Sequence, residues 1–430
     1  MKEFILYVIL FGIGCKSFSQ SSYPQTAAKI QNEKVILPGA YQTAEYLPLL
    51  KEKRVGIFAN STSMIGVTHL ADSLQKLGIK ITKIFAPEHG FRGTANAGET
   101  IKTYTDEKTG IPVISLYGTK LKPSAADLND VDVLLFDIQD VGVRFYTYIS
   151  SLQYFIESAI QNNKPLIILD RPNPNGFYVD GPVLDSSYQS FVGMQPVPVV
   201  YGMTIGEYAK MLLGEGWLPW KIERKQDGKI SLSEVLGFEE EHNNFKLTVI
   251  KCKNYTHKSR YILPVRTSPN LADMQSVYWY PSTCFFEGTV ISEGRGTEHP
   301  FQIFGHPQLP DSLYSFIPQS NAGAQEPKYK GQLCYGWNLA ESKEPLPCKI
   351  ELKWLLKAYR LFPDKENFFL KPKKFNAAPQ DYFFNKLAGS NELMQQIIDG
   401  KTETEICKSW QPKLDAFKKI RKKYLLYPDF

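Results

Sequence analysis

The sequence Ile84-Phe85-Ala86-Pro87-Glu88-His89-Gly90-Phe91-Arg92-Gly93 leads from an apolar segment into a charged loop. Residues 79–85 are rich in β-branched apolar side chains and predict a buried strand, which Pro87 ends. The loop then offers the carboxylate of Glu88, the imidazole of His89 and the guanidinium of Arg92. Ligands of open α/β sheets bind beyond the carboxyl ends of the strands, so this position favours a functional loop. A capping loop closed by a Glu88–Arg92 ion pair is the alternative.

The surrounding sequence alternates predicted strands with predicted helices. Strands that are apolar on both faces and alternate with helices are typical of a parallel sheet covered on both sides. Residues 46–216 therefore predict an α/β fold, a Rossmann-like doubly wound parallel sheet. The further strands are expected at 55–60, 112–117, 131–138 and 165–169, and the helices at 67–77, 146–160 and 204–213.

Polar side chains gather where these predicted strands end. Because the carboxyl ends of parallel strands share one edge of a sheet, loops far apart in the sequence are expected to line one cleft. This convergence strengthens the functional interpretation of Glu88. The polar groups at the strand ends are Asn60 and Ser61, Glu88 and His89, Asp137 and Asp140, and Asp170 and Arg171.

The pattern changes after residue 216, where Trp217-Leu218-Pro219-Trp220 marks a predicted boundary. Residues 217–430 combine strands such as 247–252 with Pro- and Gly-rich loops and late helices, which predicts a second, smaller α+β domain. Two of its loops are candidate binding loops, 267–271 and the charged, glycine-rich 287–298. Glycines allow the backbone of such a loop to approach a ligand closely.

The N-terminus predicts export. A positive start, an apolar stretch at 4–14 and small residues at 17–19 form a secretory signal peptide, so we assign residues 1–19 to it and 20–45 to a lead-in. Lipidation of Cys15 ranks second because Gly12 stands where a bulky aliphatic residue is expected. No other stretch reaches the roughly 18 apolar residues of a membrane span. We therefore expect a periplasmic or secreted protein without stable membrane insertion after cleavage.

Charge and cysteine content restrict the remaining possibilities. The formal net charge is +6 over 430 residues, and the basic run Lys418–Lys423 has the spacing of a solvated helix face, so we expect no nucleic-acid partner. Five cysteines remain after cleavage, an odd number that leaves at least one free thiol. Their spacing fits no zinc pattern.

Several catalytic motifs are absent from the sequence. There is no Gly-x-Gly-x-x-Gly, P-loop, Gly-x-Ser-x-Gly or His-Glu-x-x-His sequence, so we expect no cofactor and no metal ion. A cation held by Glu88, His89 and Asp137 is the weaker alternative. Carboxylates on Gly-rich loops beside aromatic residues remain, and glycoside hydrolysis uses such groups. A general acid needs a proton near neutral pH, which partial burial between an apolar strand and Phe91 would favour at Glu88.

With these motifs assembled, the chain resembles the exo-β-N-acetylmuramidases of bacterial cell-wall recycling, from about Val55 to the C-terminus. The resemblance implies a Rossmann-like N-terminal domain, a smaller C-terminal domain and an active site in the cleft between them. It also implies release of N-acetylmuramic acid from the non-reducing end of peptidoglycan fragments. The motifs are Pro-Glu-His-Gly-Phe-Arg-Gly at 87–93, Phe-Asp-Ile-Gln-Asp-Val-Gly-Val-Arg-Phe-Tyr-Thr-Tyr at 136–148, Leu-Asp-Arg-Pro-Asn-Pro at 169–174, Ser-Pro-Asn at 268–270, Glu-Gly-Thr at 287–289 and Ser-Glu-Gly-Arg-Gly-Thr at 292–297.

The resemblance places the catalytic acid at Glu88. The second catalytic group stays open between Glu293, Asp137 and the substrate's own acetamido group. Arg144, Arg171 or Arg295 is expected to pair with the lactyl carboxylate of muramic acid. The candidate substrate-binding residues are His89, Arg92, Asn60, Gln139, Arg144, Tyr146, Asp170, Arg171, Asn173, Asn270, Glu287 and Arg295.

One departure from the family pattern is Asp180-Gly181-Pro182, where members commonly have Glu-Gly-Pro, and the shorter side chain could alter substrate binding. The expected partner is a peptidoglycan-derived saccharide. Two other functions stay open: a non-catalytic envelope protein that binds muropeptides in the same cleft, and another exo-β-N-acetylhexosaminidase. The oligomeric state and the disulfide pairing are not predicted.

Overall fold

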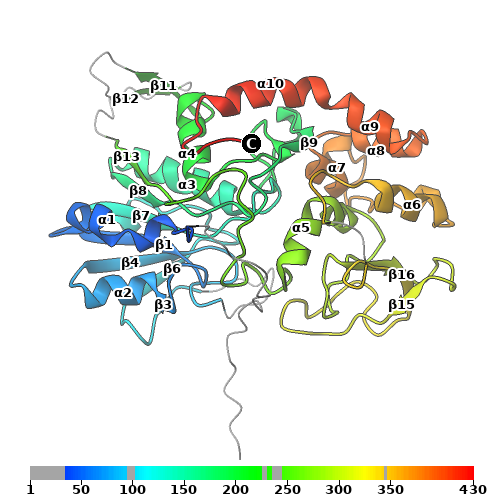
Figure 1. The fold of residues 1–430 in the computed structure, drawn as a ribbon, viewed down its shortest axis with the longest axis horizontal. Coiled ribbons are helices and arrows are strands. Elements are labelled where there is room, and N and C mark those ends of the chain that lie inside the picture. The colour runs from blue at the N-terminus through cyan, green and yellow to red at the C-terminus, as the bar shows by residue number, and fades with distance from the viewer. Residues whose placement is uncertain (1–33, 94–101, 225–229, 235–244, 343–345) are drawn as a thin grey trace, which may run out of the picture.

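The computed structural model describes residues 34–93, 102–224, 230–234, 245–342 and 346–430. A seven-stranded sheet flanked by helices forms the N-terminal part, and a smaller part with its own three-stranded sheet follows it (Figure 1). The predicted signal peptide at 1–19 and most of the predicted lead-in lie outside the described residues.

The large sheet has the strand order of the Rossmann fold. Its order is β13-β8-β7-β1-β4-β6-β5, so the chain builds outward from β1 first to one side and then to the other. All neighbouring strands are parallel except β5, which pairs antiparallel with β6 at one edge. The strands are β1 (Arg54–Ala59), β4 (Lys80–Ala86), β5 (Tyr104–Thr105), β6 (Pro112–Ser115), β7 (Val133–Asp137), β8 (Leu166–Leu169) and β13 (Leu247–Ile250).

Helices cover both faces of this sheet because its strands are apolar on both sides. Along β1, Ile57 packs with the residues of α1 (Thr43–Leu50) and α2 (Leu70–Lys76), whereas Phe58 packs with those of α3 (Tyr148–Gln161) and α4 (Ile205–Gly214). Rings of Phe58 and Phe136 stack at 4.8 Å between centroids on the second face. The doubly wound α/β fold is confirmed, with a mixed rather than fully parallel sheet.

The boundary predicted at residue 217 needs correction. The strand 247–252 was assigned to the second domain, but β13 pairs in parallel with β8 and completes the first sheet. β13 is a short, mostly apolar run, Leu-Thr-Val-Ile, and sequence alone does not tell which sheet such a short strand joins. The N-terminal part therefore extends beyond β13.

The second part is built around a small antiparallel sheet of order β14-β16-β15. Its apolar core is continuous with the α3 and α4 face of the large sheet, and Trp279 and Phe285 belong to this shared core. Helix α10 returns from the C-terminal helices toward α4 (Figure 1), where Tyr424 lies against Gly214. The elements are β14 (Ile303–His306), β15 (Tyr314–Phe316), β16 (Cys334–Asn338), α5 (Met274–Thr283), α6 (Lys353–Leu361), α7 (Phe383–Ala388), α8 (Glu392–Ile398), α9 (Glu403–Ser409) and α10 (Gln411–Lys422).

Three short hairpins complete the described strands. They are β2 (Met64–Ile65) with β3 (Thr68–His69), β9 (Asp180–Val183) with β10 (Pro198–Val200), and β11 (Trp220–Arg224) with β12 (Ile230–Glu234). Within the described ranges no helix is long and apolar enough to cross a membrane. The cysteines of the same ranges, Cys252, Cys284, Cys334, Cys348 and Cys407, are all free thiols.

Candidate active site

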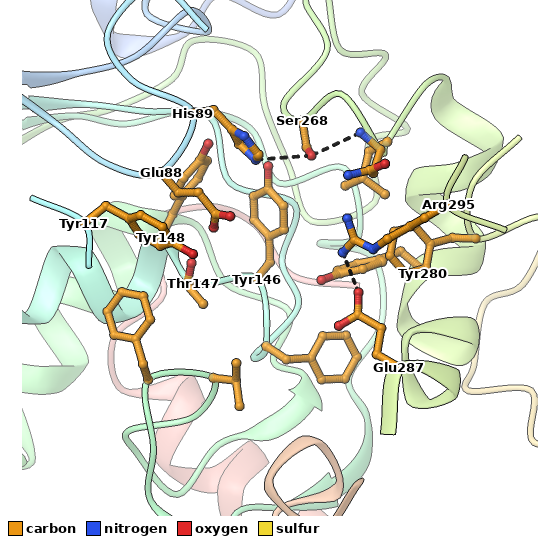
Figure 2. Close-up of a pocket in the computed structure, with 16 residues that line it drawn as sticks. Glu88, His89, Tyr117, Tyr146, Thr147, Tyr148, Ser268, Tyr280, Glu287 and Arg295 are labelled. Carbon is orange, nitrogen blue, oxygen red and sulfur yellow. Dashed lines mark hydrogen bonds and ion pairs between the residues drawn. The ribbon is translucent and has the colours of Figure 1, made fainter. Parts of the chain in front are cut away.

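A cavity of about 230 Å³ lies where loops after strands of the large sheet meet loops of the second part (Figure 2). Glu88, Tyr117 and Tyr148 lie on one side of it, and Glu287 and Arg295 on the other. The lining is Glu88, His89, Tyr117, Phe145, Tyr146, Thr147, Tyr148, Phe191, Val192, Ser268, Asn270, Leu271, Tyr280, Glu287, Arg295 and Phe301. The structure therefore brings together six of the predicted site residues: Glu88, His89, Tyr146, Asn270, Glu287 and Arg295. Tyr148, from the same motif as Tyr146, lies beside them.

Glu88 is half-buried and lies just beyond the end of β4. Its carboxylate accepts a hydrogen bond from the hydroxyl of Tyr117, which follows the neighbouring strand β6. Burial, and then the charge of Glu88 and this hydrogen bond, raise the pKa of Tyr117 to about 12, so the phenol stays a donor at neutral pH. Glu88 is thus a carboxylate with a fixed donor at the mouth of the parallel sheet.

His89 joins the two halves of the cavity. Its backbone has a φ of 68°, a left-handed conformation that is uncommon for residues other than glycine, although histidine adopts it more often than most. This conformation turns the buried imidazole toward the 267–271 loop, where Nε2 lies 3.4 Å from the hydroxyl of Ser268. Backbone strain held in place by the surroundings is a feature of functional loops.

Two tyrosines from the 136–148 motif form one wall. The Tyr146 hydroxyl donates to the carbonyl of Thr267 at 2.8 Å, and its ring meets that of Tyr148 edge to face at 4.8 Å between centroids. Asn60 lies behind this wall and donates to the Tyr148 hydroxyl at 2.7 Å. Burial, with the nearby charge of Glu88 among the further causes, raises the pKa of Tyr148, so this hydroxyl also stays protonated.

Arg295 provides the positive charge of the cavity. Its guanidinium donates to Glu287 Oε1 at 2.5 Å and lies 3.3 Å from Glu293 Oε1. The carbon of the guanidinium lies 5.2 Å from the centroid of the Phe301 ring. Glu287 and Arg295 both line the cavity, whereas Glu293 is buried behind them and is absent from its lining.

Asp137, a candidate catalytic group, lies outside the cavity lining in a buried ion pair. Its two carboxylate oxygens accept from Arg171 at 2.6 and 2.8 Å, and the exposed fractions of the two side chains are 0% and 2%. Burial disfavours the charge of Arg171, but the Asp137 carboxylate outweighs it and raises the pKa of Arg171. Both groups therefore hold the loops after β7 and β8 together.

Other predicted binding residues also stabilise these loops and do not line the cavity. Gln139 donates to the carbonyls of Asp140 and Pro172 at 2.8 Å. Asp170 accepts from Thr204 and Tyr427, at 2.7 and 2.6 Å.

Three more predicted residues are used by the scaffold. Asn173 donates to the carbonyl of Met203 at 2.8 Å. Arg144 is fully buried and donates to the carbonyls of Pro182, Val197 and Leu387 at 2.7–2.8 Å. Arg92, predicted to bind substrate, pairs with Asp72 and Asp106, so the alternative of a loop closed by a Glu88–Arg92 ion pair is not the arrangement that forms.

Asp180, which stands where family members commonly have glutamate, also lies away from the cavity. Asp180 accepts from the backbone nitrogen of Ile350 at 2.8 Å and from the Trp410 indole at 3.2 Å. It therefore connects β9 to the C-terminal helices.

Sequence reasoning missed Tyr117, Phe191, Val192 and Tyr280 as lining residues. Tyr117 carries a usable signal because it is the last residue of the strand predicted at 112–117, at the same edge of the sheet as Glu88. Phe191 and Val192 come from a connection with no such signal. In the described part of the chain, no group of three or more His, Cys, Asp or Glu residues is arranged to hold a metal ion.

The small cavity between the Rossmann-like part and the smaller part contains two carboxylates and several aromatic rings, which are groups that a carbohydrate-cleaving enzyme uses. The chain belongs to the exo-beta-N-acetylmuramidase NamZ family. The N-terminal model of that family matches residues 55–275 and the C-terminal model matches residues 278–427. The family expected from the sequence motifs is thereby confirmed.

Relatives with known names or structures agree over nearly the whole chain. The peptidoglycan beta-N-acetylmuramidase NamZ of Bacillus subtilis (strain 168) is 36% identical over 450 residues, which cover 99% of this chain and 98% of that protein. A crystal structure of a DUF1343 family protein from Bacteroides fragilis has a TM-score of 0.78 at 42% identity and covers 92% of this chain and 100% of its own. A second protein of that family and organism has a TM-score of 0.70 at 27% identity, with 91% and 99% covered.

Proposed function

We propose that this protein is an exo-acting glycoside hydrolase that releases N-acetylmuramic acid from the non-reducing end of peptidoglycan fragments, with Glu88 as general acid. The observation that carries the assignment of Glu88 is its place in the cavity: half-buried at the end of β4 and hydrogen-bonded by Tyr117. A general acid must reach the glycosidic oxygen of a bound sugar, and among the described lining residues the only other carboxylate, Glu287, is held by Arg295.

The second catalytic group is assigned to the substrate's own acetamido oxygen. Neither Asp137 nor Glu293 lines the cavity. Asp137 is paired with Arg171, and Glu293 is paired with Lys328 and Arg295. In substrate-assisted hydrolysis the acetamido oxygen attacks the anomeric carbon while the acid protonates the leaving oxygen, and no protein nucleophile is needed. A trifluoroacetamido analogue has a weaker nucleophile, so its kcat should fall steeply if this assignment is right.

Arg295 is assigned to the lactyl carboxylate that distinguishes muramic acid from glucosamine. Arg144 and Arg171 are buried outside the cavity lining, where they donate to backbone carbonyls and to Asp137. Arg295 also has carboxylate partners, but it lines the cavity. A guanidinium forms bidentate, charge-assisted hydrogen bonds with a carboxylate. This contact would favour muramides over glucosaminides.

The test compares hydrolysis of a chromogenic β-N-acetylmuramide with that of the matching glucosaminide. The wild-type protein should release the chromophore from the muramide, and Glu88→Gln should lower kcat by about 100-fold or more with an unchanged unfolding transition. Glu366→Gln, at an exposed carboxylate paired with Lys371, is the matched control and should retain full activity. An active Glu88→Gln enzyme would exclude Glu88 as the acid.

The same assay separates the two rival functions. Binding of muramyl saccharides without turnover would favour the envelope-binding protein, and equal turnover of both sugars would favour another hexosaminidase. We also propose a periplasmic or secreted location, because residues 1–19 have the parts of a signal peptide. Cell fractionation, with the mature N-terminus found at Gln20, would support it; a lipid-modified Cys15 would contradict the cleavage site.

A further inference from the structure

Lys328 reaches from the 317–333 segment into the loop that carries the charged groups of the cavity. Its ammonium nitrogen donates to the carbonyl oxygens of Phe286 at 3.0 Å, Thr289 at 2.9 Å and Ile291 at 3.1 Å. The same nitrogen lies 3.0 Å from Glu293 Oε2. An ammonium has three donors and no acceptor, so this set of oxygens satisfies it completely.

The ammonium of Lys328 also makes the numbers of positive and negative charges equal in the group of charged side chains beside the cavity. Glu287 and Glu293 contribute two negative charges, and Arg295 contacts both of them, at 2.5 and 3.3 Å. Lys328 supplies the second positive charge: it contacts the carboxylate of Glu293, whereas at Glu287 it reaches only the backbone carbonyl, at 3.4 Å. Burial disfavours ionisation of Glu293, but Lys328 and then Arg295 outweigh it and lower its pKa, so the carboxylate is charged.

Arg295 can interact with a ligand in the cavity or with the carboxylate of Glu293. It lines the cavity, where it is available to a ligand, and it lies beside the buried Glu293. Without Lys328, a buried carboxylate would have Arg295 as its remaining cation, and an unpaired buried charge is strongly disfavoured. The guanidinium would then be neutralised by two carboxylates before a third, from a substrate, could bind.

We propose that Lys328 is a specificity-determining positioning residue: it neutralises Glu293 and so leaves Arg295 able to bind the carboxylate of an acidic sugar. The inference rests on the proposed function of Arg295 in recognising the lactyl group. Lys328 itself does not line the cavity and acts through Glu293 and Arg295.

Equilibrium binding tests this role without depending on catalysis. The dissociation constants of N-acetylmuramic acid and N-acetylglucosamine are measured by calorimetry on the full mature chain. Lys328→Met should weaken binding of N-acetylmuramic acid about tenfold or more, as expected when a charge-assisted contact is lost, and leave N-acetylglucosamine unchanged. Lys330→Met is the matched control, because Lys330 forms an exposed pair with Glu326 in the same segment.

A double variant distinguishes charge balance from loop structure. Lys328→Met combined with Glu293→Gln has no surplus negative charge, so it should regain the binding of N-acetylmuramic acid. Glu293→Gln alone should keep the preference for the acidic sugar. Because this variant retains Lys328, it still tests the proposal if Lys328→Met fails to fold. Equal weakening of both sugars, or no recovery in the double variant, would overturn the proposal.

A wild-type protein that binds the two sugars equally would also overturn it. That result would leave hydrolysis by Glu88 standing, because turnover of the chromogenic muramide is measured separately. Turnover by Glu88→Gln, or no turnover by the wild-type protein, together with an intact sugar preference would remove Glu88 as the acid and leave the role of Lys328 in place.

Discussion

Asp137→Asn should destabilise the protein strongly while leaving the chemical step largely intact. The substitution keeps the shape of the side chain but removes the only carboxylate that pairs with Arg171 in the described structure. Both side chains are buried, with exposed fractions of 0% and 2%, and two hydrogen bonds of 2.6 and 2.8 Å join them. Breaking such a pair from one side costs about 3–5 kcal/mol, because the remaining charge stays buried without its partner.

A surface pair in the same sheet gives the matched control. The Asp132 carboxylate accepts hydrogen bonds from the side chain and from the backbone nitrogen of Arg54, but the side chains of Asp132 and Arg54 are 34% and 39% exposed. Exposed pairs of this kind contribute about 1 kcal/mol or less, so Asp132→Asn should shift stability far less than Asp137→Asn. The two variants carry the same chemical change and differ in burial.

Urea denaturation measures the free energy of unfolding of both variants, and kcat on the chromogenic muramide is measured in the absence of denaturant. The expected result is a loss of about 3–5 kcal/mol for Asp137→Asn with kcat within about tenfold of the wild type. If Asp137→Asn were as stable as Asp132→Asn but had a kcat lowered about 1,000-fold, the structural role of Asp137 would be refuted. Asp137 would then act on the substrate.

Two further predictions concern hydroxyl and carboxyl groups near the cavity. Tyr117→Phe removes the hydrogen bond to Glu88 and should lower kcat about tenfold with little change in KM or unfolding temperature; unchanged steady-state kinetics would contradict a role for this contact. Burial raises the pKa of Asp140 to about 6, so the folded state holds its proton more tightly than the unfolded state, and this contribution to stability is complete below about pH 4 and is lost as pH rises through 6. Asparagine does not titrate, so the free energy of unfolding of Asp140→Asn relative to that of the wild type should rise by about 3 kcal/mol between pH 4 and pH 7. Urea denaturation at both pH values measures this difference, and a difference that does not change with pH would argue against a buried charge at Asp140.

Sequence reasoning predicted the α/β class because hydrophobic patterning is local. The strands at β1, β4, β7 and β8 were found within a few residues of their observed bounds, since continuous apolar runs bounded by polar loops have few other solutions. The edge strand β5 and the position of β13 were not foreseen. Two residues in β5 leave no periodicity, and the pairing of β13 with β8 joins segments about 80 residues apart.

The family motifs also located the region of the cavity. The segments at 87–93, 136–148, 268–270 and 287–297 each contribute lining residues. The motifs did not separate residues that face the cavity from residues that support it. Tyr146 lines the cavity, for example, whereas Arg144 in the same motif donates to three backbone carbonyls.

The sequence by itself determined the class of fold, the family and the edge of the sheet where charged groups gather, because these follow from periodicity and from ordered motifs. Only the tertiary structure decided what each charged group does. Asp137 ends one strand of the large sheet and Glu88 follows another, yet Asp137 is neutralised by Arg171 and Glu88 lines the cavity beside Tyr117. The function of an ionisable side chain depends on its burial and on the partner that long-range folding brings to it, and neither is encoded in its local sequence.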